Sequence, residues 1–348
     1  MPNHELYMQR CLQLAAIGQQ WVSPNPMVGA LVVNNGIIIG EGYHQQFGGP
    51  HAEVNAINAV QDKAMLKGAT IYVSLEPCAH YGKTPPCAQL IIEHKIAKVV
   101  IACLDPNPLV AGKGITLLQK AGIEVITGVL DKEAKELNKI FIHFYTQKKP
   151  FVILKWAQTA DGFCGRYSNT TLSNKITNWY ADILVHQLRS TSSAILVGYN
   201  TAMIDNPLLT TRKWFGKNPL RVVIDVEGKL PSHLNLFTDG SPTLVFTQAS
   251  KQDTQTVSYI KLNNKTHFID EILDGLYQKN IQSVLIEGGP KTLQMFMDSN
   301  AWNEAHIFTS NSEWREGIKS PIFKNGTEAL HKNLLNDTYI FYKPETNL

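Results

Sequence analysis

The apolar positions near the start of the chain recur with a helical period. Leu6, Cys11 and Leu14 fall on one side of a helix, so residues 5–19 are expected to be helical. We expect this side to pack against a core, because an apolar stripe on a helix needs a covering surface. The chain therefore opens with a predicted amphipathic helix.

The next segments predict a pair of strands and then helices and strands in alternation. Apolar runs at 28–33 and 37–42 flank Asn34-Asn35-Gly36, whose residue types favour a tight hairpin turn. Strands that alternate with helices indicate a three-layer α/β domain, whose later strands are expected to be parallel. The elements predicted after the hairpin are helix 52–60, strand 69–75, helix 88–94, strand 97–103, helix 112–121, strand 123–127 and helix 131–143.

The second half begins with a strongly apolar run. Residues 150–157 are expected to form a buried strand, after a break in the pattern at Lys148-Lys149-Pro150. A length of 348 residues suggests two domains, and we place them at residues 1–146 and 150–348. The further elements predicted are strands 194–197, 221–224, 243–247 and 283–286 and helices 179–188 and 291–299.

Composition and charge exclude several classes of protein. Hydrophobic residues make up 44% of the chain and charged residues 18%, as in a globular protein with an ample core. A net charge of +3 with dispersed basic residues argues against nucleic-acid binding but fits small anionic substrates. We find no signal peptide and no apolar stretch near the roughly 20 residues that span a membrane. Thiols kept for a metal would fit a reducing cytoplasm.

Three residues in the first half have the side chains of a zinc site. His51, Cys78 and Cys87 supply one imidazole and two thiols, and three protein ligands are typical of catalytic zinc. The fourth position is then left for a water molecule, whose pKa zinc lowers to about 7. Glu53 can stay off the metal and carry protons as general acid and base. This pattern predicts a zinc-dependent deaminase.

The predicted secondary structure supports the metal interpretation. His51 and Glu53 fall in the first turn of one predicted helix, and Cys87 opens another after Thr84-Pro85-Pro86. Thiolates and other anions are stabilised at helix N-termini. The alternative is that the five cysteines of the chain are scattered free thiols and the histidine a satisfied core or surface residue.

The spacing of the two cysteines narrows the substrate class. Deaminases that act on nucleic-acid bases carry these ligands as Cys-x-x-Cys. Eight residues separate Cys78 from Cys87, among them His80, Lys83 and Thr84. We expect this longer loop to cover a small substrate.

A glycine-rich turn in the second half points to a phosphate. Strand 284–286 leads into Glu287-Gly288-Gly289-Pro290 and then into a helix, where free backbone N–H groups can contact an anion. Such turns are common, so this signal alone leaves an ordinary loop equally open. No Gly-x-Gly-x-x-Gly motif occurs, so a Rossmann dinucleotide site has no support.

These motifs together resemble the bifunctional deaminase-reductase family of riboflavin biosynthesis, over most of the chain. Matching stretches in the first half are Pro24 to Gly29, Gly42-Tyr43-His44, Pro50 to Val54, Glu76 to Cys87 and Asp105 to Pro108. Matching stretches in the second half are Lys155 to Gly162, Gly198 to Arg212 and Glu287 to Pro290.

The resemblance implies a fold, two activities and their ligands. It implies a cytidine-deaminase-like domain with one Zn²⁺, followed by a dihydrofolate-reductase-like domain with NADPH. The implied substrates are phosphoribosylated pyrimidines, which are deaminated and then reduced at the ribosyl group, and the implied assembly is a homo-oligomer.

The resemblance also assigns residues of the reductase half. Arginines 189 and 212 suit a ribose phosphate, because a guanidinium binds phosphate through two hydrogen bonds, but each could be a solvated surface residue. Asp205 is the proposed proton donor or orienter, although it could form a turn before Pro207. The implied cofactor contacts are Ala157, Lys175, Thr201, Asp205, Gly289, Pro290, Lys291, Thr292, Leu293, Gln294 and Met295. The implied substrate contacts are Ser173, Arg189, Leu209, Arg212 and Glu287.

The chain departs from the family pattern at three places near the cofactor. Segment 163–171 carries about two extra residues, Lys175 stands where a tryptophan is usual, and Val226 stands where a serine is frequent. A lysine can still contact a phosphate of NADPH.

Two alternatives remain from the residues. The first is a tRNA or nucleoside deaminase with an unrelated C-terminal domain. The second is a binding module with structural zinc, which normally has four protein ligands.

Overall fold

The structure is a computed structural model of the whole chain, and it describes residues 3–79, 85–107, 111–167, 173–263 and 267–345. The chain forms two compact units, Met1–Lys148 and Lys149–Leu348, which we describe separately. No helix within the described ranges has the length and apolar character that a membrane span requires.

A mixed five-stranded sheet forms the middle of the first unit, in the order β2-β1-β3-β4-β5. The edge strand β2 is antiparallel to β1, and β1 is antiparallel to β3. From β3 onward the strands are parallel, as the alternation with helices predicted. The strands are β1 (Gly29–Asn34), β2 (Ile37–Tyr43), β3 (Thr70–Leu75), β4 (Lys98–Cys103) and β5 (Glu124–Thr127).

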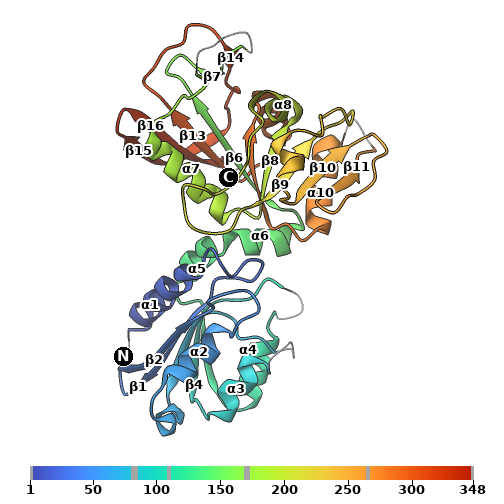
Figure 1. Cartoon of the computed structure of the whole chain (residues 1–348). Coiled ribbons are helices and arrows are strands. Elements are labelled where there is room, and N and C mark those ends of the chain that lie inside the picture. Colours follow the sequence, from blue (N-terminus) through green and yellow to red (C-terminus); the bar gives the residue numbers. More distant parts are fainter. Residues whose placement is uncertain (1–2, 80–84, 108–110, 168–172, 264–266, 346–348) are drawn as a thin grey trace. The chain divides into compact units, whose positions relative to one another are not determined.

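Helices cover both faces of this sheet, so the unit has three layers (Figure 1). Successive residues of β1 point to opposite faces: Ala30 and Val32 pack with α2, α3 and α4, whereas Leu31 and Val33 pack with α1 and α5. The helices are α1 (His4–Ile17), α2 (Ala52–Ala59), the 3-10 helix η1 (Lys63–Leu66), α3 (Cys87–Glu93), α4 (Lys113–Lys120), α5 (Asp131–Leu137) and α6 (Lys139–Gln147).

Two details of the first unit differ from the sequence predictions. Leu6 is 60% exposed, and Met8 occupies the buried side of α1 in its place. The helix predicted at 131–143 is divided at Asn138, which is buried and holds the Met27 backbone through bonds of 2.8 and 2.9 Å. A polar side chain that is bonded across the structure has therefore divided one predicted helix into two.

The second unit is built on a nine-stranded sheet, in the order β11-β10-β9-β8-β12-β6-β13-β16-β15. The strands from β11 to β13 are parallel, and β16 and β15 continue the sheet in antiparallel fashion. These strands are β6 (Phe151–Gln158), β8 (Ala194–Gly198), β9 (Leu220–Ile224), β10 (Thr243–Thr247), β11 (Val257–Lys261), β12 (Ser283–Gly288), β13 (Glu304–Thr309), β15 (Gly326–Leu334) and β16 (Asp337–Pro344).

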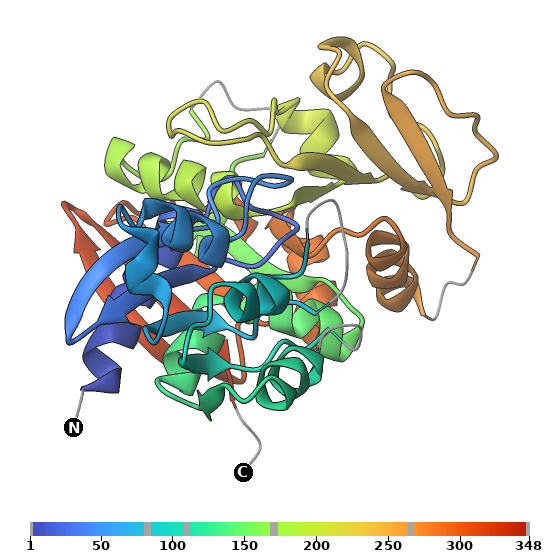
Figure 2. The same ribbon diagram turned by 90° about the horizontal axis from the view of Figure 1, so that it is seen from below.

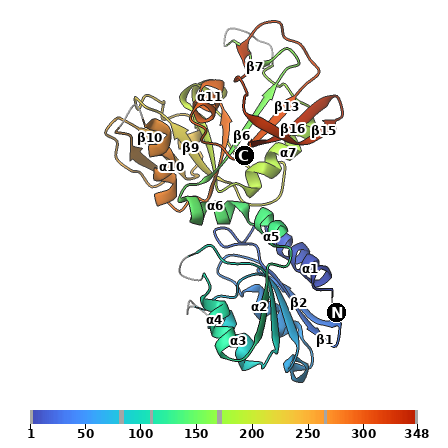
Figure 3. The same ribbon diagram turned by 180° about the vertical axis from the view of Figure 1, so that it is seen from behind.

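Helices also cover both faces of the larger sheet (Figure 3). Helices α10 and α11 pack on the main core with Leu154 and Ile286, and α7 packs on the opposite face against Phe308. The helices are α7 (Trp179–Thr191), α8 (Tyr199–Asp205), α9 (Asn235–Thr238), α10 (Phe268–Gln278) and α11 (Pro290–Asp298). A small separate sheet pairs β7 (Phe163–Gly165) with β14 (Ile318–Lys319).

The order of the strands in the second unit places a potential ligand site between β8 and β12. After β8 the chain runs outward through β9, β10 and β11, in the yellow-to-orange part of Figures 1 and 2. After β12, the immediate neighbour of β8, the chain runs the other way to β13. The connections therefore diverge between β8 and β12, and such points at the carboxyl ends of parallel strands are where open α/β sheets bind ligands.

Candidate active sites

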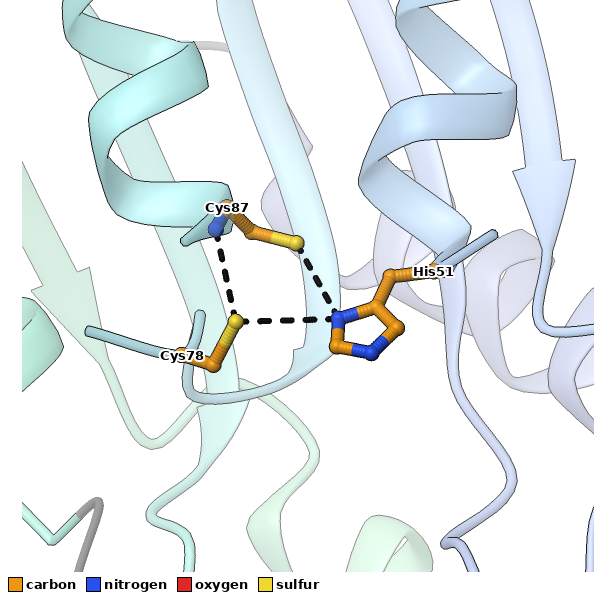
Figure 4. Close-up of side chains that lie close together, drawn as sticks. All are labelled: His51, Cys78 and Cys87. Atoms are coloured by element: carbon orange, nitrogen blue, oxygen red, sulfur yellow. Dashed lines mark hydrogen bonds between the residues drawn. The ribbon is translucent and has the colours of Figure 1, made fainter. Parts of the chain in front are cut away.

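His51, Cys78 and Cys87 come together in the first unit (Figure 4). The ligand atoms all lie within 4.8 Å of one another, and His51 Nδ1 lies 3.3 Å from Cys87 Sγ and 3.6 Å from Cys78 Sγ. Zinc bonds of about 2.3 Å to sulfur and about 2.0 Å to nitrogen place tetrahedral ligands roughly 3.5–3.8 Å apart. The three side chains therefore have the spacing of a tetrahedral metal site with one position left over.

Local backbone structure sets the three side chains in place. His51 is the N-cap of α2, Cys87 is the first residue of α3, and Cys78 follows β3. The Cys87 N–H donates to Cys78 Sγ at 3.3 Å, and the Ala88 N–H donates to the Cys78 carbonyl at 3.1 Å. The first turn of α3 thus binds the segment that carries the other cysteine.

Electrostatics at the cluster favour an anionic sulfur. The hydrogen bond with Cys87, aided by that with His51, lowers the pKa of Cys78 to about 4 despite burial. The hydrogen bond with Cys78, together with burial, raises the pKa of Cys87. The hydrogen bond between His51 and Cys78 likewise raises the pKa of His51. The cluster therefore favours one thiolate, and a divalent metal would favour loss of the second thiol proton.

Glu53 lies in the first turn of α2, two residues after His51. Its side chain is buried, with the residue only 3% exposed. Burial and the nearby negative charge of Cys78 raise the pKa of Glu53 to about 7. A carboxyl group with that pKa can both accept and release a proton near neutral pH.

A buried carboxylate outside the three-residue cluster, that of Glu76, anchors the segment that carries Cys78 to the start of α4. Glu76 is buried and accepts hydrogen bonds from the N–H groups of Gly112 at 3.0 Å and Gly114 at 3.1 Å. A side chain at Gly114 would come within 2.0 Å of the Pro77 carbonyl oxygen. The start of α4 therefore packs directly on the backbone next to Cys78.

A second histidine supports His51. The ring of His44 lies edge-on to that of His51, with 5.7 Å between the ring centroids. His44 Nδ1 lies 2.9 Å from the Pro50 carbonyl oxygen, so it donates there, and Nε2 then accepts from Asn25 Nδ2 at 3.0 Å. In the sequence, Asn25 and His44 stand out only as parts of the family motifs, which imply no role for either. His80, Lys83 and Thr84, which we expect in the loop that covers a small substrate, lie outside the described residues.

A cavity of about 620 Å³ lies at the divergence point of the second sheet. It is formed by the carboxyl ends of β6, β8 and β12 together with the starts of α8 and α11. Many of the residues predicted for the cofactor and substrate line it. They are Ala157, Thr201, Asp205, Glu287, Gly289, Pro290, Lys291, Thr292 and Leu293.

A buried ion cluster lies at one wall of this cavity. Arg189 donates to both carboxylate oxygens of Glu287 at 2.7 Å, and Lys155 Nζ lies 3.7 Å from the same carboxylate. Burial would raise the pKa of Glu287, but the charges of Lys155 and Arg189 outweigh it and lower the pKa to about 2. Burial lowers the pKa of Lys155 in spite of Glu287. Arg189 is the closer partner, because it makes two bonds of 2.7 Å to the carboxylate whereas Lys155 lies 3.7 Å away.

Arg189 also connects this cluster to the segment that carries Arg212. It donates to the Thr210 carbonyl at 3.0 Å, two residues before Arg212. Arg212 itself is exposed, and its nearest bond is a long one of 3.5 Å to Thr210 Oγ1. The structure thus pairs Glu287 with Arg189 and ties the segment of Arg212 to Arg189, although neither arginine lines the cavity itself.

The remaining predicted residues do not line this cavity. Ser173 and Lys175 are exposed, and Lys175 pairs with Asp182 at 3.6 Å. Leu209 is buried in the fold, and Gln294 is bonded to Asp298 and Ile322. Met295 belongs to a neighbouring cavity.

Sequence reasoning left out several residues that do line the cavity. Lys155 is the single charged residue in the apolar strand β6, and a charge in such a strand is a recognisable signal. Arg166 and Asn174 also line the cavity and are linked, because the Arg166 N–H donates to Asn174 Oδ1 at 2.8 Å. No pattern in the sequence pointed to these two.

Comparison with known proteins matches each half of the chain to a different family model. Residues 1–103 match the cytidine and deoxycytidylate deaminase zinc-binding region, and residues 150–310 match the RibD C-terminal domain. The riboflavin biosynthesis protein RibD of Aquifex aeolicus is 42% identical over 97% of both chains. That of Bacillus amyloliquefaciens is 45% identical over 87% of this chain and 83% of its own.

The chain belongs to the RibD family. A crystal structure from Thermotoga maritima, a diaminohydroxyphosphoribosylaminopyrimidine deaminase/5-amino-6-(5-phosphoribosylamino)uracil reductase, superposes with a TM-score of 0.87 at 37% identity over 98% of each chain. RibD of Acinetobacter baumannii superposes with a TM-score of 0.88 at 30% identity over 99% of each.

Membership of the RibD family confirms the predicted fold class and function. The chain is a bifunctional enzyme of riboflavin biosynthesis, with a deaminase domain of the cytidine deaminase class and a RibD reductase domain. The alternative of a nucleic-acid deaminase with an unrelated second domain is not favoured, because the second half itself matches a RibD domain. A purely structural zinc module is likewise excluded, since the chain is an enzyme.

Proposed function

We propose that residues 1–146 deaminate 2,5-diamino-6-(5-phosphoribosylamino)pyrimidin-4(3H)-one. His51, Cys78 and Cys87 would hold one Zn²⁺, and the observation that supports this is the spacing of their ligand atoms, all within 4.8 Å. Zinc with three protein ligands supplies an activated water molecule.

Glu53 would move the protons of this reaction. It would take a proton from the attacking water and deliver protons to the ring nitrogen and the departing ammonia. A pKa of about 7 suits both steps, because the group is partly ionised at working pH. The buried setting that raises this pKa also keeps bulk water from competing for the proton.

We further propose that residues 150–348 reduce the ribosyl group of 5-amino-6-(5-phosphoribosylamino)uracil to ribityl. NADPH supplies the hydride for this step, and the sugar C1 in its ring-opened or iminium form is the acceptor, since an aromatic pyrimidinedione resists reduction. The start of α11 would hold the cofactor, because the backbone N–H groups after Gly288-Gly289 suit a phosphate. Gly289 also leaves room beside Thr201, since a Cβ on Gly289 would lie only 3.1 Å from Thr201 Oγ1.

The charged residues of the second cavity would orient the substrate. Glu287 is held ionised between Arg189 and Lys155, so it can accept hydrogen bonds from hydroxyl or ring N–H groups. Arg212 would bind the phosphate, because it is exposed beside this cluster and Arg189 is committed to Glu287. Asp205, at the end of α8 on the cavity wall, would donate or orient a proton.

Metal removal and product analysis test both halves. We expect the purified chain to contain zinc and to release ammonia from the diaminopyrimidine ribotide without NADPH. Adding NADPH should then give the ribityl product. Chelation should abolish ammonia release yet leave NADPH oxidation with the deaminated ribotide unchanged, because the predicted ligands all lie in the first unit. Loss of both activities on chelation would contradict this division.

A further inference from the structure

A second cavity, of about 640 Å³, adjoins the first in the reductase unit. The two share Gly198, Tyr199 and Thr292 in their linings, so they form one continuous cleft. The first lies over β6, β12 and β8, whereas the second lies over the carboxyl ends of β8, β9 and β10. The cleft therefore extends well beyond the proposed site of hydride transfer.

The walls of the second cavity suit a flat aromatic ring. Apolar side chains from several elements line it: Ile224 of β9, Val226 just after that strand, Phe268 of α10 and Met295 of α11. Val226 packs against the main core, and its aliphatic side chain offers no polar group to a ligand. An adenine ring could be held here between apolar side chains, as in most small-molecule sites.

The polar end of this cavity carries two opposite charges. Glu227 and Lys229 both line it and form an ion pair with each other, with side chains 67% and 69% exposed. Exposed pairs of this kind contribute little to stability, so a ligand can separate them at small cost. Both charges are therefore available for recognition.

The turn that carries this pair is held in place. The buried Asp225 carboxylate accepts hydrogen bonds from the N–H of Lys229 at 3.0 Å and of Leu230 at 2.9 Å. Gly228 has φ +68, and a Cβ there would come within 2.7 Å of the Ala249 Cβ. The backbone positions of Glu227 and Lys229 are thus fixed before any ligand arrives, which lowers the entropy cost of binding.

We propose that the Glu227–Lys229 pair determines which nicotinamide dinucleotide the reductase accepts, with Lys229 binding the 2′-phosphate of the adenosine ribose. This rests on the proposed reductase function. With the phosphates at the start of α11, the apolar walls of the second cavity take the adenine and the ribose reaches the charged end.

The two charges act in opposite directions on this choice. A carboxylate near the adenosine ribose accepts hydrogen bonds from the 2′-hydroxyl of NADH, whereas a cation accommodates the 2′-phosphate of NADPH. Lys229 therefore favours NADPH, and Glu227 opposes it by repelling the phosphate and by competing for Lys229. Preference for NADPH is the balance of the two.

Calorimetric titration of the full-length protein tests the proposal directly. The probes are NADPH, NADH, adenosine 2′,5′-bisphosphate and 5′-AMP. We expect Lys229→Gln to weaken NADPH and the bisphosphate tenfold or more, and to change NADH and 5′-AMP less than twofold. Glu227→Gln should tighten NADPH and weaken NADH. Steady-state KM values for the two dinucleotides should move in the same directions.

Lys251→Gln is the matched control. Lys251 lies close to Gly228 but does not line the cavity, so removing its charge should leave the NADPH-to-NADH ratio within twofold of wild type. If Lys229→Gln weakens both dinucleotides equally, or no more than Lys251→Gln does, the proposal is wrong while the reductase function stands. If the wild-type protein binds neither dinucleotide and reduces no substrate, the proposed function and this inference both fall.

Discussion

Glu53 is buried, and burial together with the nearby charge of Cys78 raises its pKa to about 7. We predict that Glu53→Gln keeps its zinc, because Glu53 is not among the three clustered ligands. Deamination should fall by at least the roughly 10²–10⁴-fold typical of acid–base catalysis. Ammonia release and metal content would be measured together.

The exposed Glu93→Gln, on α3 of the same unit, is a control for the chemical change alone and should deaminate normally. Normal turnover by Glu53→Gln itself would remove Glu53 from the mechanism.

Arg212 is the exposed cation beside the buried Arg189–Glu287 pair. Arg212→Ala should raise KM for the deaminated ribotide by an order of magnitude or more, since a bond to a charged group contributes about 1.5–3 kcal/mol. NADPH affinity should change much less. The exposed Lys279→Ala, outside both cavities, controls for loss of surface charge. A collapse of NADPH binding with intact ribotide binding would show that the two pockets were assigned the wrong way round.

The contact between α4 and the Cys78 segment is a property of whole elements. Because a Cβ at Gly114 would lie 2.0 Å from the Pro77 carbonyl oxygen, Gly114→Ala must push α4 away from the loop. We predict faster zinc loss to a chelator, slower deamination and a destabilisation of about 1–3 kcal/mol, as for other overpacked sites. Lys113→Ala, on the exposed side of the same helix, should show none of these effects.

Reductase activity gives Gly114→Ala a second control. It should be unaffected, because the contact lies within the first unit. Wild-type zinc retention in Gly114→Ala would mean that the loop adjusts without moving Cys78.

The elements were predicted well where their signals are local. The hairpin formed as expected, because Asn35 and Gly36 both adopt the positive φ that its turn needs. The break at Asn138 was missed, since its cause is a pair of bonds to Met27, 111 residues away in sequence. The prediction that Leu6 lies on the buried side of α1 was wrong, because the helical period of the apolar residues does not specify which side of the helix the sheet covers.

The stability of the second unit should depend on pH through a buried histidine. His186 is 4% exposed on α7, and its Nδ1 has no hydrogen-bond partner among the described residues. Burial, together with the charges of Arg189 and Arg212, lowers its pKa to about 4. Below pH 6.5 the unfolded chain therefore takes up a proton that the folded chain does not, so stability falls as pH falls from 6.5 to about 4.

Comparison with His186→Gln isolates this effect from other titrating groups. The free energy of unfolding of the wild-type protein, minus that of His186→Gln, should fall by about 3 kcal/mol between pH 7 and pH 4. Each unit by which the pKa is shifted contributes about 1.4 kcal/mol to this difference. Denaturant titrations at several pH values would measure it. A difference that does not change with pH would mean that His186 is protonated in the folded protein.

For the molecule as a whole, the sequence by itself determined the division into a deaminase and a reductase half, and it singled out the three side chains that the structure brings together as a possible metal site. His51, Cys78 and Cys87 could be found in this way because each lies at a helix start or loop whose residue types, proline and glycine included, are a local signal. Ligand chemistry restricts zinc to few side chains, so their order along the chain was informative.

Only the tertiary structure decided how the reductase cleft is built. Glu287 meets Arg189 across 98 residues, and Lys155 joins them from another strand, because β12 inserts between β6 and β8. The sequence pattern does not specify this order of strands, because the order depends on how the helices pack on the two faces of the sheet. The charges of Glu227 and Lys229 are visible in the sequence, but only the fold places them at the end of the same cleft.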